Sequence, residues 1–463
     1  MKFLLIRAGG WKQHKADNLV APITHPPLGL LCVGAALEQR NHKVEIIDFY
    51  AENVTREQLK NALKSSDAVG ISVYTKNYKQ AADISRTIKE LDSEIPVIIG
   101  GPHCIFFQKK SLLHIPHADI VVNGEGEHAI LDIAQYFEGK KELSDIHGIH
   151  YKDNNQIKAG KPLQIIDKLD SLPFPARHLV DKYDYGDLPW GYQIKKKVTA
   201  MFTSRGCPFS CRFCTQYSNV IKGWNFREKS AESIVREIQE MDKKYRTILV
   251  VDDNFLVDIK RAHKIFDMLI ESNKNVNLFL EGMRVESANR DLFLKMKKAG
   301  VKFIKYGIES GNQDVLDFYN KKITLQQIRN AVELSRDAGF ITYGSFILGA
   351  PIETKKHLEN TIKFACSLPL DIAVFGPLMY MKGSQLWLDA VKNKKISEDE
   401  HFVPADSRRG LGNFTIEELR RYSEGAFRRF YMRPSYIINQ CYRGLLRKDL
   451  SLFTNGFNFL SDL

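Results

Sequence analysis

The stretch Cys207-Pro208-Phe209-Ser210-Cys211-Arg212-Phe213-Cys214 carries three cysteines, separated by three and then two residues, on one short loop. It directly follows a strand-like run at residues 198–203. A structural zinc site needs four closed ligands, so three thiolates leave such a site incomplete. Three thiolates match the ligands of three irons in a [4Fe–4S] cluster, whose fourth iron then stays open to a chelating ligand. A partial zinc site and three unrelated cysteines are the alternative interpretations.

The positions of the other cysteines help to decide between a metal site and a disulfide framework. The remaining cysteines, Cys32, Cys104, Cys366 and Cys441, are scattered. One cluster of three beside scattered single residues indicates a metal site in a reducing compartment rather than a disulfide framework. We therefore expect a cytoplasmic protein.

Length, composition and net charge limit the classes of protein to which this chain can belong. The chain has 463 residues, 44% hydrophobic and 26% charged, which suits two or three globular domains. No apolar run is long enough to cross a bilayer, and residues 1–7 read as a strand rather than a signal peptide. The net charge of +12 suits nucleic acid, an anionic membrane surface or anionic small molecules as partners, and it equally suits a lysine-rich solvated surface.

The cysteine loop opens a series of alternating strands and helices over residues 198–380. Strands are predicted at residues 198–203, 247–251, 277–282, 302–307, 341–348 and 371–375. Helices are predicted at residues 230–245, 259–272, 290–299, 325–338 and 356–367. Six such units fit a partial (β/α)6 TIM-type barrel, in which functional residues lie at the carboxyl ends of the strands.

A second alternating pattern covers residues 1–140. Strands are predicted at residues 2–7, 43–48, 68–73, 96–99 and 119–123, and helices at residues 28–41, 55–65, 78–91 and 125–137. Apolar strands between amphipathic helices predict a Rossmann-like, doubly wound parallel sheet. No G-x-G-x-x-G follows the first strand, so the dinucleotide-binding fingerprint is absent.

Small and polar residues gather where the strands of this first sheet end. Pro26-Pro27-Leu28-Gly29 closes the long loop after the first strand, and Ser72-Val73-Tyr74-Thr75 ends the third. Gly100-Gly101-Pro102-His103 follows the fourth strand, and Gly124-Glu125-Gly126-Glu127 follows the fifth. Ligands of doubly wound sheets bind at this edge, where glycine lets the backbone approach them closely. We therefore expect a ligand site at the carboxyl edge of the first sheet.

The cysteine loop resembles the signature of radical S-adenosylmethionine (SAM) enzymes, cysteine-x3-cysteine-x-aromatic-cysteine, with Phe213 at the aromatic position. The partial barrel predicted around it is the architecture of that family. The resemblance implies that Cys207, Cys211 and Cys214 are the catalytic metal ligands of a [4Fe–4S] cluster that chelates SAM. It also implies cleavage of SAM to a 5′-deoxyadenosyl radical, which abstracts hydrogen from an unactivated carbon.

The same resemblance implies where SAM is bound. In chain order the implied positions are Phe213, Asp252, Asp253, Arg284, Glu309, Ser310, Gly349 and Pro351. The aspartates are expected near the methionine amino group and the arginine near its carboxylate. The glutamate and serine are expected at the ribose or carboxylate, and the Gly-x-Pro turn beside the adenine. Each position alone also fits turn or cap chemistry, since Glu353 and Thr354 can simply start a helix.

The turns of the first sheet resemble the cobalamin-binding domain that precedes the catalytic core in one large class of radical SAM enzymes. The implied cobalamin contacts are Pro27, Leu28, Gly29, Ser72, Tyr74, Thr75, Gly100, Gly101, Pro102, His103, Gly124, Glu125 and Gly126. The Asp-x-His-x-x-Gly motif that supplies a lower axial histidine in cobalamin mutases is absent. His103 therefore either approaches cobalt or packs near the ligand. A degenerate sheet that only supports the core is the alternative for the whole domain.

Residues 141–197 are polar and rich in turns, and we expect them to form a linker. Lys152-Asp153-Asn154-Asn155 reads as a hairpin turn, and prolines follow at residues 173 and 175. Tyr183, Tyr185, Trp190 and Tyr192 stand just before the core, as packing residues or as a wall for a substrate.

Residues 381–463 are expected to form a helical tail. Arginines alternate with aromatic and aliphatic residues over residues 415–433. A basic amphipathic helix of this kind either caps the bottom of the barrel or lies on an anionic membrane.

These features together imply a cobalamin-dependent radical SAM enzyme, foremost a methyltransferase. A radical cyclase resembling the anaerobic magnesium-protoporphyrin IX monomethyl ester cyclase shares the same cofactors and stays open, as does a non-catalytic cobalamin-binding sensor. A methylthiotransferase is disfavoured because Cys32 and Cys104 make no second cluster triad. Expected partners are a small-molecule or lipid substrate and an electron donor such as ferredoxin or flavodoxin, with no nucleic acid. A lipid is included because similar enzymes act on hopanoids and archaeal ether lipids, so peripheral membrane contact also stays open.

Overall fold

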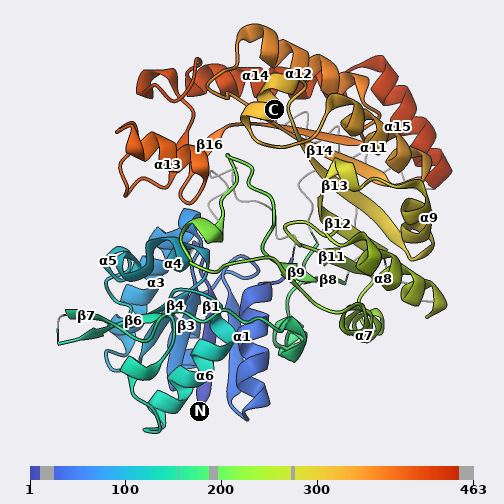
Figure 1. The fold of residues 1–463 in the computed structure, drawn as a ribbon. Coiled ribbons are helices and arrows are strands. Elements are labelled where there is room, and N and C mark those ends of the chain that lie inside the picture. Colours follow the sequence, from blue (N-terminus) through green and yellow to red (C-terminus); the bar gives the residue numbers. More distant parts are fainter. Residues whose placement is uncertain (11–24, 155, 187–196, 273–276, 448–463) are drawn as a thin grey trace. The chain divides into compact units, whose positions relative to one another are not determined.

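The computed structural model describes residues 1–10, 25–154, 156–186, 197–272 and 277–447, and the chain divides into two compact units (Figure 1). The first unit comprises Met1–Tyr185 with Val220–Trp224, and the second comprises Gly186–Asn219 with Asn225–Leu463. Each unit is built on its own largely parallel sheet. The α/β class predicted from the sequence is confirmed.

The first unit contains a seven-stranded sheet with the strand order β2-β1-β3-β4-β5-β6-β7. Its strands are β1 (Lys2–Arg7), β2 (Lys43–Asp48), β3 (Ala68–Ser72), β4 (Val97–Gly100), β5 (Ile120–Val122), β6 (Ile149–Asp153) and β7 (Gln156–Ala159). Its helices are α1 (Leu28–Gln39), α2 (Arg56–Leu63), α3 (Tyr78–Leu91), α4 (Pro102–Phe107), α5 (Ser111–His114) and α6 (Gly126–Phe137). The first five strands are parallel, as predicted for a doubly wound sheet.

Alternating apolar side chains explain why helices cover both faces of this sheet. Leu4 and Ile6 of β1 are buried in one cluster with residues of α2 and α3. Phe3 and Leu5 are buried in a second cluster with residues of α1 and α6. Because successive side chains of a strand point to opposite faces, a fully apolar strand needs a cover on both. Burial of each side chain of this size contributes roughly 1.5–3 kcal/mol to the free energy of folding.

The hairpin β6–β7 lies within the stretch expected to be a linker, and it continues the first sheet. It pairs antiparallel with β5, where Ile120 faces Tyr151. Without this hairpin β5 would be an open sheet edge. The expected turn near Asn154 does join the two strands, which pair up to Asp153 and Gln156. The sequence shows a hairpin of this kind but not the strand with which it pairs.

Two of the four aromatic residues that precede the core pack on the first sheet. Tyr185 is buried and its hydroxyl donates to the Asp48 carboxylate at 3.0 Å. The Tyr183 hydroxyl donates to the Glu52 carboxylate. Trp190 and Tyr192 lie outside the described residues.

The second unit is built on six parallel strands in the order β15-β14-β13-β12-β11-β8. They are β8 (Val198–Met201), β11 (Thr247–Val250), β12 (Asn277–Met283), β13 (Val301–Glu309), β14 (Ile341–Leu348) and β15 (Ile372–Pro377). The helices between them are α7 (Ala231–Asp242), α8 (Ile259–Glu271), α9 (Arg290–Lys298), α10 (Gln313–Phe318), α11 (Leu325–Asp337) and α12 (Lys355–Ser367). Six β/α units in sequential order match the predicted partial barrel.

Short antiparallel pairs and terminal helices complete the second unit. They are β9 (Ser204–Arg205) with β10 (Arg227–Glu228), β16 (Met379–Met381) with β17 (Phe402–Pro404), and the helices α13 (Gln385–Lys392), α14 (Ile416–Tyr431) and α15 (Pro434–Arg447). The β9–β10 pair brackets the cysteine loop, because β9 ends just before it and β10 follows it.

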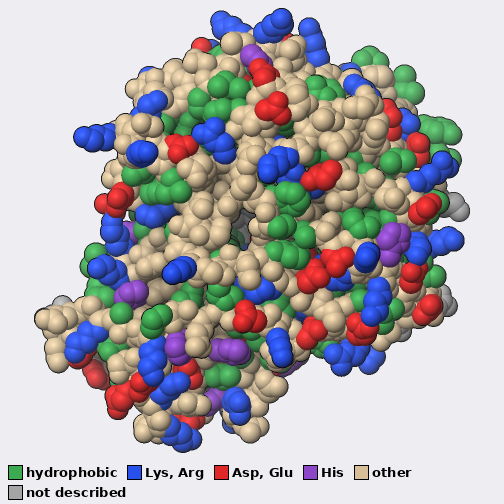
Figure 2. All heavy atoms as spheres, in the orientation of Figure 1, with side chains coloured by type: hydrophobic (Ala, Val, Ile, Leu, Met, Phe, Trp, Pro, Cys, Tyr) green, Lys and Arg blue, Asp and Glu red, His purple; other side chains and the backbone are tan. Residues whose placement is uncertain are grey.

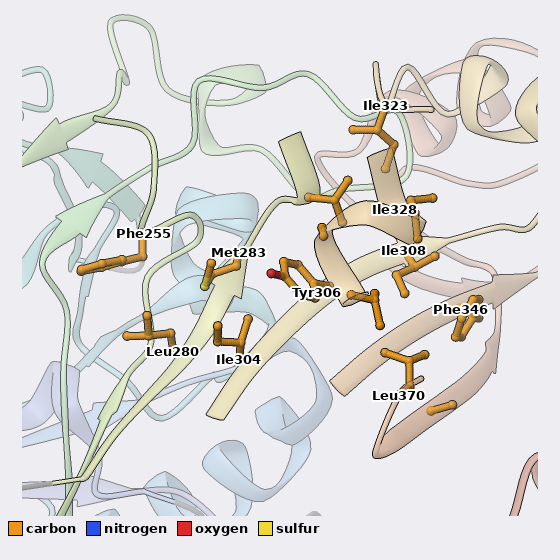
Figure 3. Packing of buried hydrophobic residues seen from close by; sticks show 14 of the residues in the cluster. Phe255, Leu280, Met283, Ile304, Tyr306, Ile308, Ile323, Ile328, Phe346 and Leu370 are labelled. Carbon is orange, nitrogen blue, oxygen red and sulfur yellow. The ribbon is translucent and has the colours of Figure 1, made fainter. Parts of the chain in front are cut away.

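The apolar core of the second unit lies between the sheet and its helices. Figure 3 shows Tyr306 of β13 among side chains that include Met283, Ile304 and Ile308. The Tyr306 hydroxyl bonds the Ser335 hydroxyl of α11 at 2.8 Å, so this buried polar group is satisfied.

The last described helices pack on the barrel. Leu419 and Phe430 of α14 are buried in the core of the second unit. On α15, Arg443 makes an ion pair at 2.8 Å with Asp371, which immediately precedes β15. Arg443 also donates to the Phe340 carbonyl, just before β14, at 2.9 Å. Within the described residues the tail therefore covers the amino-terminal ends of two strands, which was one of its two predicted roles.

The charge of the chain is spread rather than gathered on the face shown in Figure 2, where Lys and Arg side chains alternate with Asp and Glu. Among the described helices, none combines the length and the apolar character that a membrane crossing needs.

Candidate active site

The cysteine loop lies at the carboxyl end of β8, where the partial barrel was expected to place it. Gly206, at a φ of +81°, turns the chain into the loop, and the Cys214 amide donates to the Cys211 carbonyl at 3.1 Å. Cys207 and Cys214 are exposed, whereas Cys211 is buried. A positive φ favours glycine, which explains the residue that precedes the first cysteine.

The three thiols fit a [4Fe–4S] cluster by the chemistry of the donor set. Soft sulfur ligands suit such a cluster, and each thiolate binds a separate iron, so the sulfurs need not converge on one point. Within the described ranges, no three His, Cys, Asp or Glu side chains converge as ligands of a single metal ion. Although part of Cys214 reaches solvent, desolvation by its surroundings raises the pKa of this thiol to about 12. Binding iron there must therefore displace a proton.

The loop that follows α10 is hydrogen-bonded to the cysteine loop. The Arg212 amide donates to the Tyr319 carbonyl at 2.9 Å, and the Asn320 side chain donates to the Ser210 carbonyl at 3.0 Å. The rings of Phe213 and Tyr319 meet edge to face, with centroids 5.0 Å apart. The aromatic position of the motif thus packs the cysteine loop onto the end of α10.

The paired aspartates after β11 have different surroundings. Asp252 is buried and accepts hydrogen bonds from the Thr203 amide at 2.6 Å and the Ser204 hydroxyl at 2.8 Å. It therefore ties β11 to the end of β8. Asp253 reaches solvent, and desolvation raises its pKa, with the charge of Asp252 adding to the effect. Of the two carboxylates, Asp253 is the one open to a ligand.

Asn254 completes the stretch Asp252-Asp253-Asn254, which the resemblance places near the methionine amino group. Its side chain is buried, and neither amide atom has a hydrogen-bond partner among the described residues. A buried amide normally has partners, so this one is suited to bind a ligand or water. Its position directly after the aspartate pair was the only signal in the sequence.

Arg284 directly follows β12 and is buried, with its guanidinium engaged by protein groups. It pairs with Glu286, donates to the Lys321 carbonyl, and places Nη1 3.5 Å from the Cys211 sulfur. The sequence predicted this arginine near the methionine carboxylate, and the structure places it against the cysteine loop.

Glu309 and Ser310 end β13 at the same edge of the sheet. Glu309 is buried, has a φ of +70° and forms an ion pair with Lys321 at 2.8 Å. A Cβ atom at Gly307 would lie 2.3 Å from the Glu309 carboxylate, so glycine makes room for the pair. The Ser310 hydroxyl lies 3.2 Å from that of Thr361. The strained backbone of a non-glycine residue is a common property of functional sites.

The Gly-x-Pro turn ends β14. Glu353 is buried there and accepts hydrogen bonds from the amides of Gly349 at 2.6 Å and Ala350 at 2.8 Å. Burial raises the pKa of Glu353 to about 7. The Pro351 carbonyl accepts from Asn413 at 3.0 Å. Thr354 begins α12 with a capping box, so the cap chemistry considered for this residue is present.

In the first unit, the predicted cobalamin contacts follow β1, β3, β4 and β5. Because these strands are parallel, the contacts share one edge of the sheet. Gly101 has a φ of +104°, and a Cβ there would lie 3.0 Å from the Val73 carbonyl oxygen. Pro27, Leu28 and Gly29 lie at the start of α1, and Gly124, Glu125 and Gly126 at the start of α6. Ser72, Tyr74 and Thr75 end β3 and begin the turn after it, and Gly100 ends β4.

Pro102 and His103 begin α4, where the sequence indicated only a turn. The His103 ring is buried, 3.0 Å from the His114 ring nitrogen and stacked on Phe107 with centroids 4.4 Å apart. This environment is that of a packed side chain, one of the two roles considered for this histidine.

Two family models match the chain. Residues 201–365 match the Radical SAM superfamily, and residues 15–134 match the B12 binding domain. The first match contains the cysteine loop and the ends of β11 to β14, and the second contains the turns of the first sheet.

Curated relatives extend the match over nearly the whole chain. An uncharacterized methyltransferase of Pyrococcus horikoshii is 31% identical over 96% of this chain and 98% of its own. The cytidylyl-2-hydroxyethylphosphonate methyltransferase of Streptomyces wedmorensis is 26% identical over 84% of this chain and 82% of its own. The anaerobic magnesium-protoporphyrin IX monomethyl ester cyclase of Rubrivivax gelatinosus is 27% identical over 71% of this chain and 60% of its own.

Solved structures share the fold. The radical SAM methyltransferase TsrM of Kitasatospora setae, with tryptophan and a SAM analogue bound, has a TM-score of 0.66 and 17% identity over 85% of this chain and 76% of its own. The cobalamin-dependent radical SAM enzyme OxsB has a TM-score of 0.64 and 20% identity over 87% of this chain and 57% of its own. At these identities the likeness concerns the fold alone.

Proposed function

The chain belongs to the radical SAM enzymes that carry a B12-binding domain, and on this premise we propose that it methylates an unactivated carbon of a small-molecule substrate. The cofactors of the family are a [4Fe–4S] cluster, SAM and cobalamin. The observation that carries the proposal is the match with the uncharacterized methyltransferase of Pyrococcus horikoshii, which is 31% identical and covered over 98% of its length. Both units of this chain lie within that match.

Ring formation is the rival reaction, because the cyclases share the cofactor set. The chain spans 60% of the length of the Rubrivivax cyclase, against 98% of the Pyrococcus methyltransferase. This difference in coverage supports methyl transfer. The two reactions differ in mass balance, since methylation adds one carbon from SAM and cyclisation adds none.

Each protein group then has an assigned task. Cys207, Cys211 and Cys214 hold the cluster, which when bound supplies the electron that cleaves SAM. Asp253 is the free carboxylate at the end of β11 and binds the methionine amino group. The turn at Gly349 holds the adenine by its backbone. The carboxyl edge of the first sheet holds cobalamin, with glycines such as Gly101 where the backbone meets the ligand.

The test is an anaerobic reconstitution with iron, sulfide and cobalamin, followed by SAM and a reductant. We expect 5′-deoxyadenosine to form with the wild-type chain and to fall to background in Cys211→Ala, which removes one of three iron ligands. SAM labelled in its methyl group then distinguishes methylation from cyclisation, because only methylation labels the product. A wild-type protein that holds no cluster and cleaves no SAM contradicts the proposal.

A lipid-like substrate at a membrane surface is the finer part of the proposal, and the last described helix supports it. Ile438, Tyr442 and Leu445 of α15 are between 63% and 69% exposed and recur at helical spacing, so they form one apolar stripe. Flotation with anionic and neutral liposomes at low salt is the test. Failure to float with either kind removes this part and leaves the methyl transfer unaffected.

The electron donor is proposed to be a small protein of the ferredoxin or flavodoxin kind. Replacing dithionite by reduced flavodoxin in the assay tests this. Formation of 5′-deoxyadenosine only with dithionite would exclude that donor.

A further inference from the structure

Arg284 stands between β12 and the cysteine loop and is 6% exposed. Its guanidinium carbon lies over the Phe209 ring, 3.8 Å from the centroid. Its edge is occupied by the Glu286 carboxylate, the Lys321 carbonyl and the Cys211 sulfur. A guanidinium held at its face and along its edge has little freedom to turn toward another ligand.

This arrangement differs from the one needed to bind the SAM carboxylate. A bidentate contact with a carboxylate uses two parallel N–H groups of the fork. Here Nη2 donates to the Lys321 carbonyl and Nε donates to the Glu286 carboxylate. Nη1 donates to the Cys211 sulfur at 3.5 Å. Each of the three guanidinium nitrogens therefore already has a protein partner.

The sulfur that receives this contact is the most sheltered of the three. Cys211 is 7% exposed, whereas Cys207 and Cys214 are exposed. Charge-assisted hydrogen bonds gain strength where water is excluded. A hydrogen bond donated to the Cys211 sulfur is therefore stronger than one donated to either of the two exposed sulfurs would be.

Hydrogen bonds to the sulfurs of an iron–sulfur cluster, and positive charge beside it, shift its reduction potential. Both stabilise the reduced, more negative state, so they make the potential less negative. The Lys321 ammonium lies 5.7 Å from the Phe213 ring centroid, but its ion pair with Glu309 cancels most of its charge, so the hydrogen bond from Arg284 is the contact that matters here.

We propose that Arg284 is a positioning residue that fixes Cys211 and makes the potential of the cluster less negative by donating a hydrogen bond to the Cys211 sulfur. This inference rests on the proposed function, because it requires the cluster. It assigns the residue to the electron-accepting step instead of to SAM recognition.

The test is a redox titration of the reconstituted full chain without SAM, monitored by electron paramagnetic resonance. At the midpoint potential of the wild type, we expect the ratio of reduced to oxidised cluster in Arg284→Gln to fall about tenfold, which is ~59 mV for one electron. Arg284→Lys keeps the charge and should lie between the two. Arg212→Gln is the matched control, because Arg212 sits within the same loop but pairs with Asp389 at 2.9 Å.

The outcomes separate the two possible roles of the arginine. An unchanged potential in Arg284→Gln with a raised Kd for SAM overturns the proposal and makes Arg284 a SAM ligand. The single variant Arg284→Gln leaves the Glu286 carboxylate without its ion-pair partner. If this variant loses iron, the double variant Arg284→Gln with Glu286→Gln is measured as well, because it removes that carboxylate. Loss of iron in both variants but not in Arg212→Gln supports the positioning of Cys211. A wild type that binds no cluster overturns the proposed function itself.

Discussion

At the scale of single residues, Glu353 shows how burial sets a proton affinity. The carboxyl group is fully buried, with one oxygen on two backbone amides and the other without a partner among the described residues. Burial disfavours the charged form, and this outweighs the two hydrogen bonds that favour it. The pKa therefore lies near 7 rather than at its ordinary value of 4.5.

This raised pKa predicts how stability changes with pH. The folded state binds the Glu353 proton more tightly than the unfolded state, so its contribution is full below pH 4.5 and is lost as the pH rises to about 7. The shift corresponds to roughly 3 kcal/mol. Glu353→Gln stays neutral and should remove this part of the pH dependence. Urea unfolding of both proteins between pH 5 and 8 is the check, and parallel curves would contradict the prediction.

At the scale of elements, α15 is held to the barrel by polar contacts. Asp371 is fully buried and meets Arg443 at 2.8 Å and Arg447 at 3.3 Å, while Gln440 donates to it at 3.1 Å. The apolar stripe of the same helix points to solvent. Ion pairs thus attach the helix along one side, and Tyr436 near its start adds a ring contact with Phe430.

Removing one partner of that buried group should release the helix. Arg443→Met leaves Asp371 partly unpaired, and breaking a buried ion pair costs about 3–5 kcal/mol. We expect faster amide hydrogen exchange over α15 and a lower unfolding midpoint. Arg420→Met on the exposed side of α14 is the control and should change neither. Equal exchange rates in the two variants would show that the ion pair does not hold the helix.

The elements themselves were largely predictable, because local patterns specify them. The strands at Lys2–Arg7 and Lys43–Asp48 agree with the prediction at both ends, since a charged residue stands at each end of the run. The pairing of β6 with β5 was not predictable, because the choice of partner depends on residues distant in sequence. The contacts of Arg284 with the Lys321 carbonyl and the Cys211 sulfur were missed for the same reason, since both partners are distant from it in sequence.

At the scale of the whole molecule, the two cofactor sites belong to different compact units. The cysteine loop lies in the second unit, and the glycine turns that we propose to hold cobalamin lie in the first. Each unit has its own apolar core, which makes each fold an independent support for its site.

This division predicts that the two cofactors bind separately. Cys211→Ala should lose the cluster and still retain one equivalent of cobalamin after gel filtration, as measured by its visible absorbance. Loss of cobalamin together with the cluster would show that the sites depend on each other. The wild type, reconstituted in parallel, is the reference for both cofactors.

The turn at Gly349 packs closely against α14. A Cβ atom at Gly349 would lie 2.6 Å from Leu419, which α14 presses into the space that a side chain would need. A side chain at position 349 would have to displace the end of Leu419, and the φ of +102° also favours glycine there. A chain shortened before α14 would therefore leave this turn uncovered, so the helix serves the same edge of the barrel as the cysteine loop.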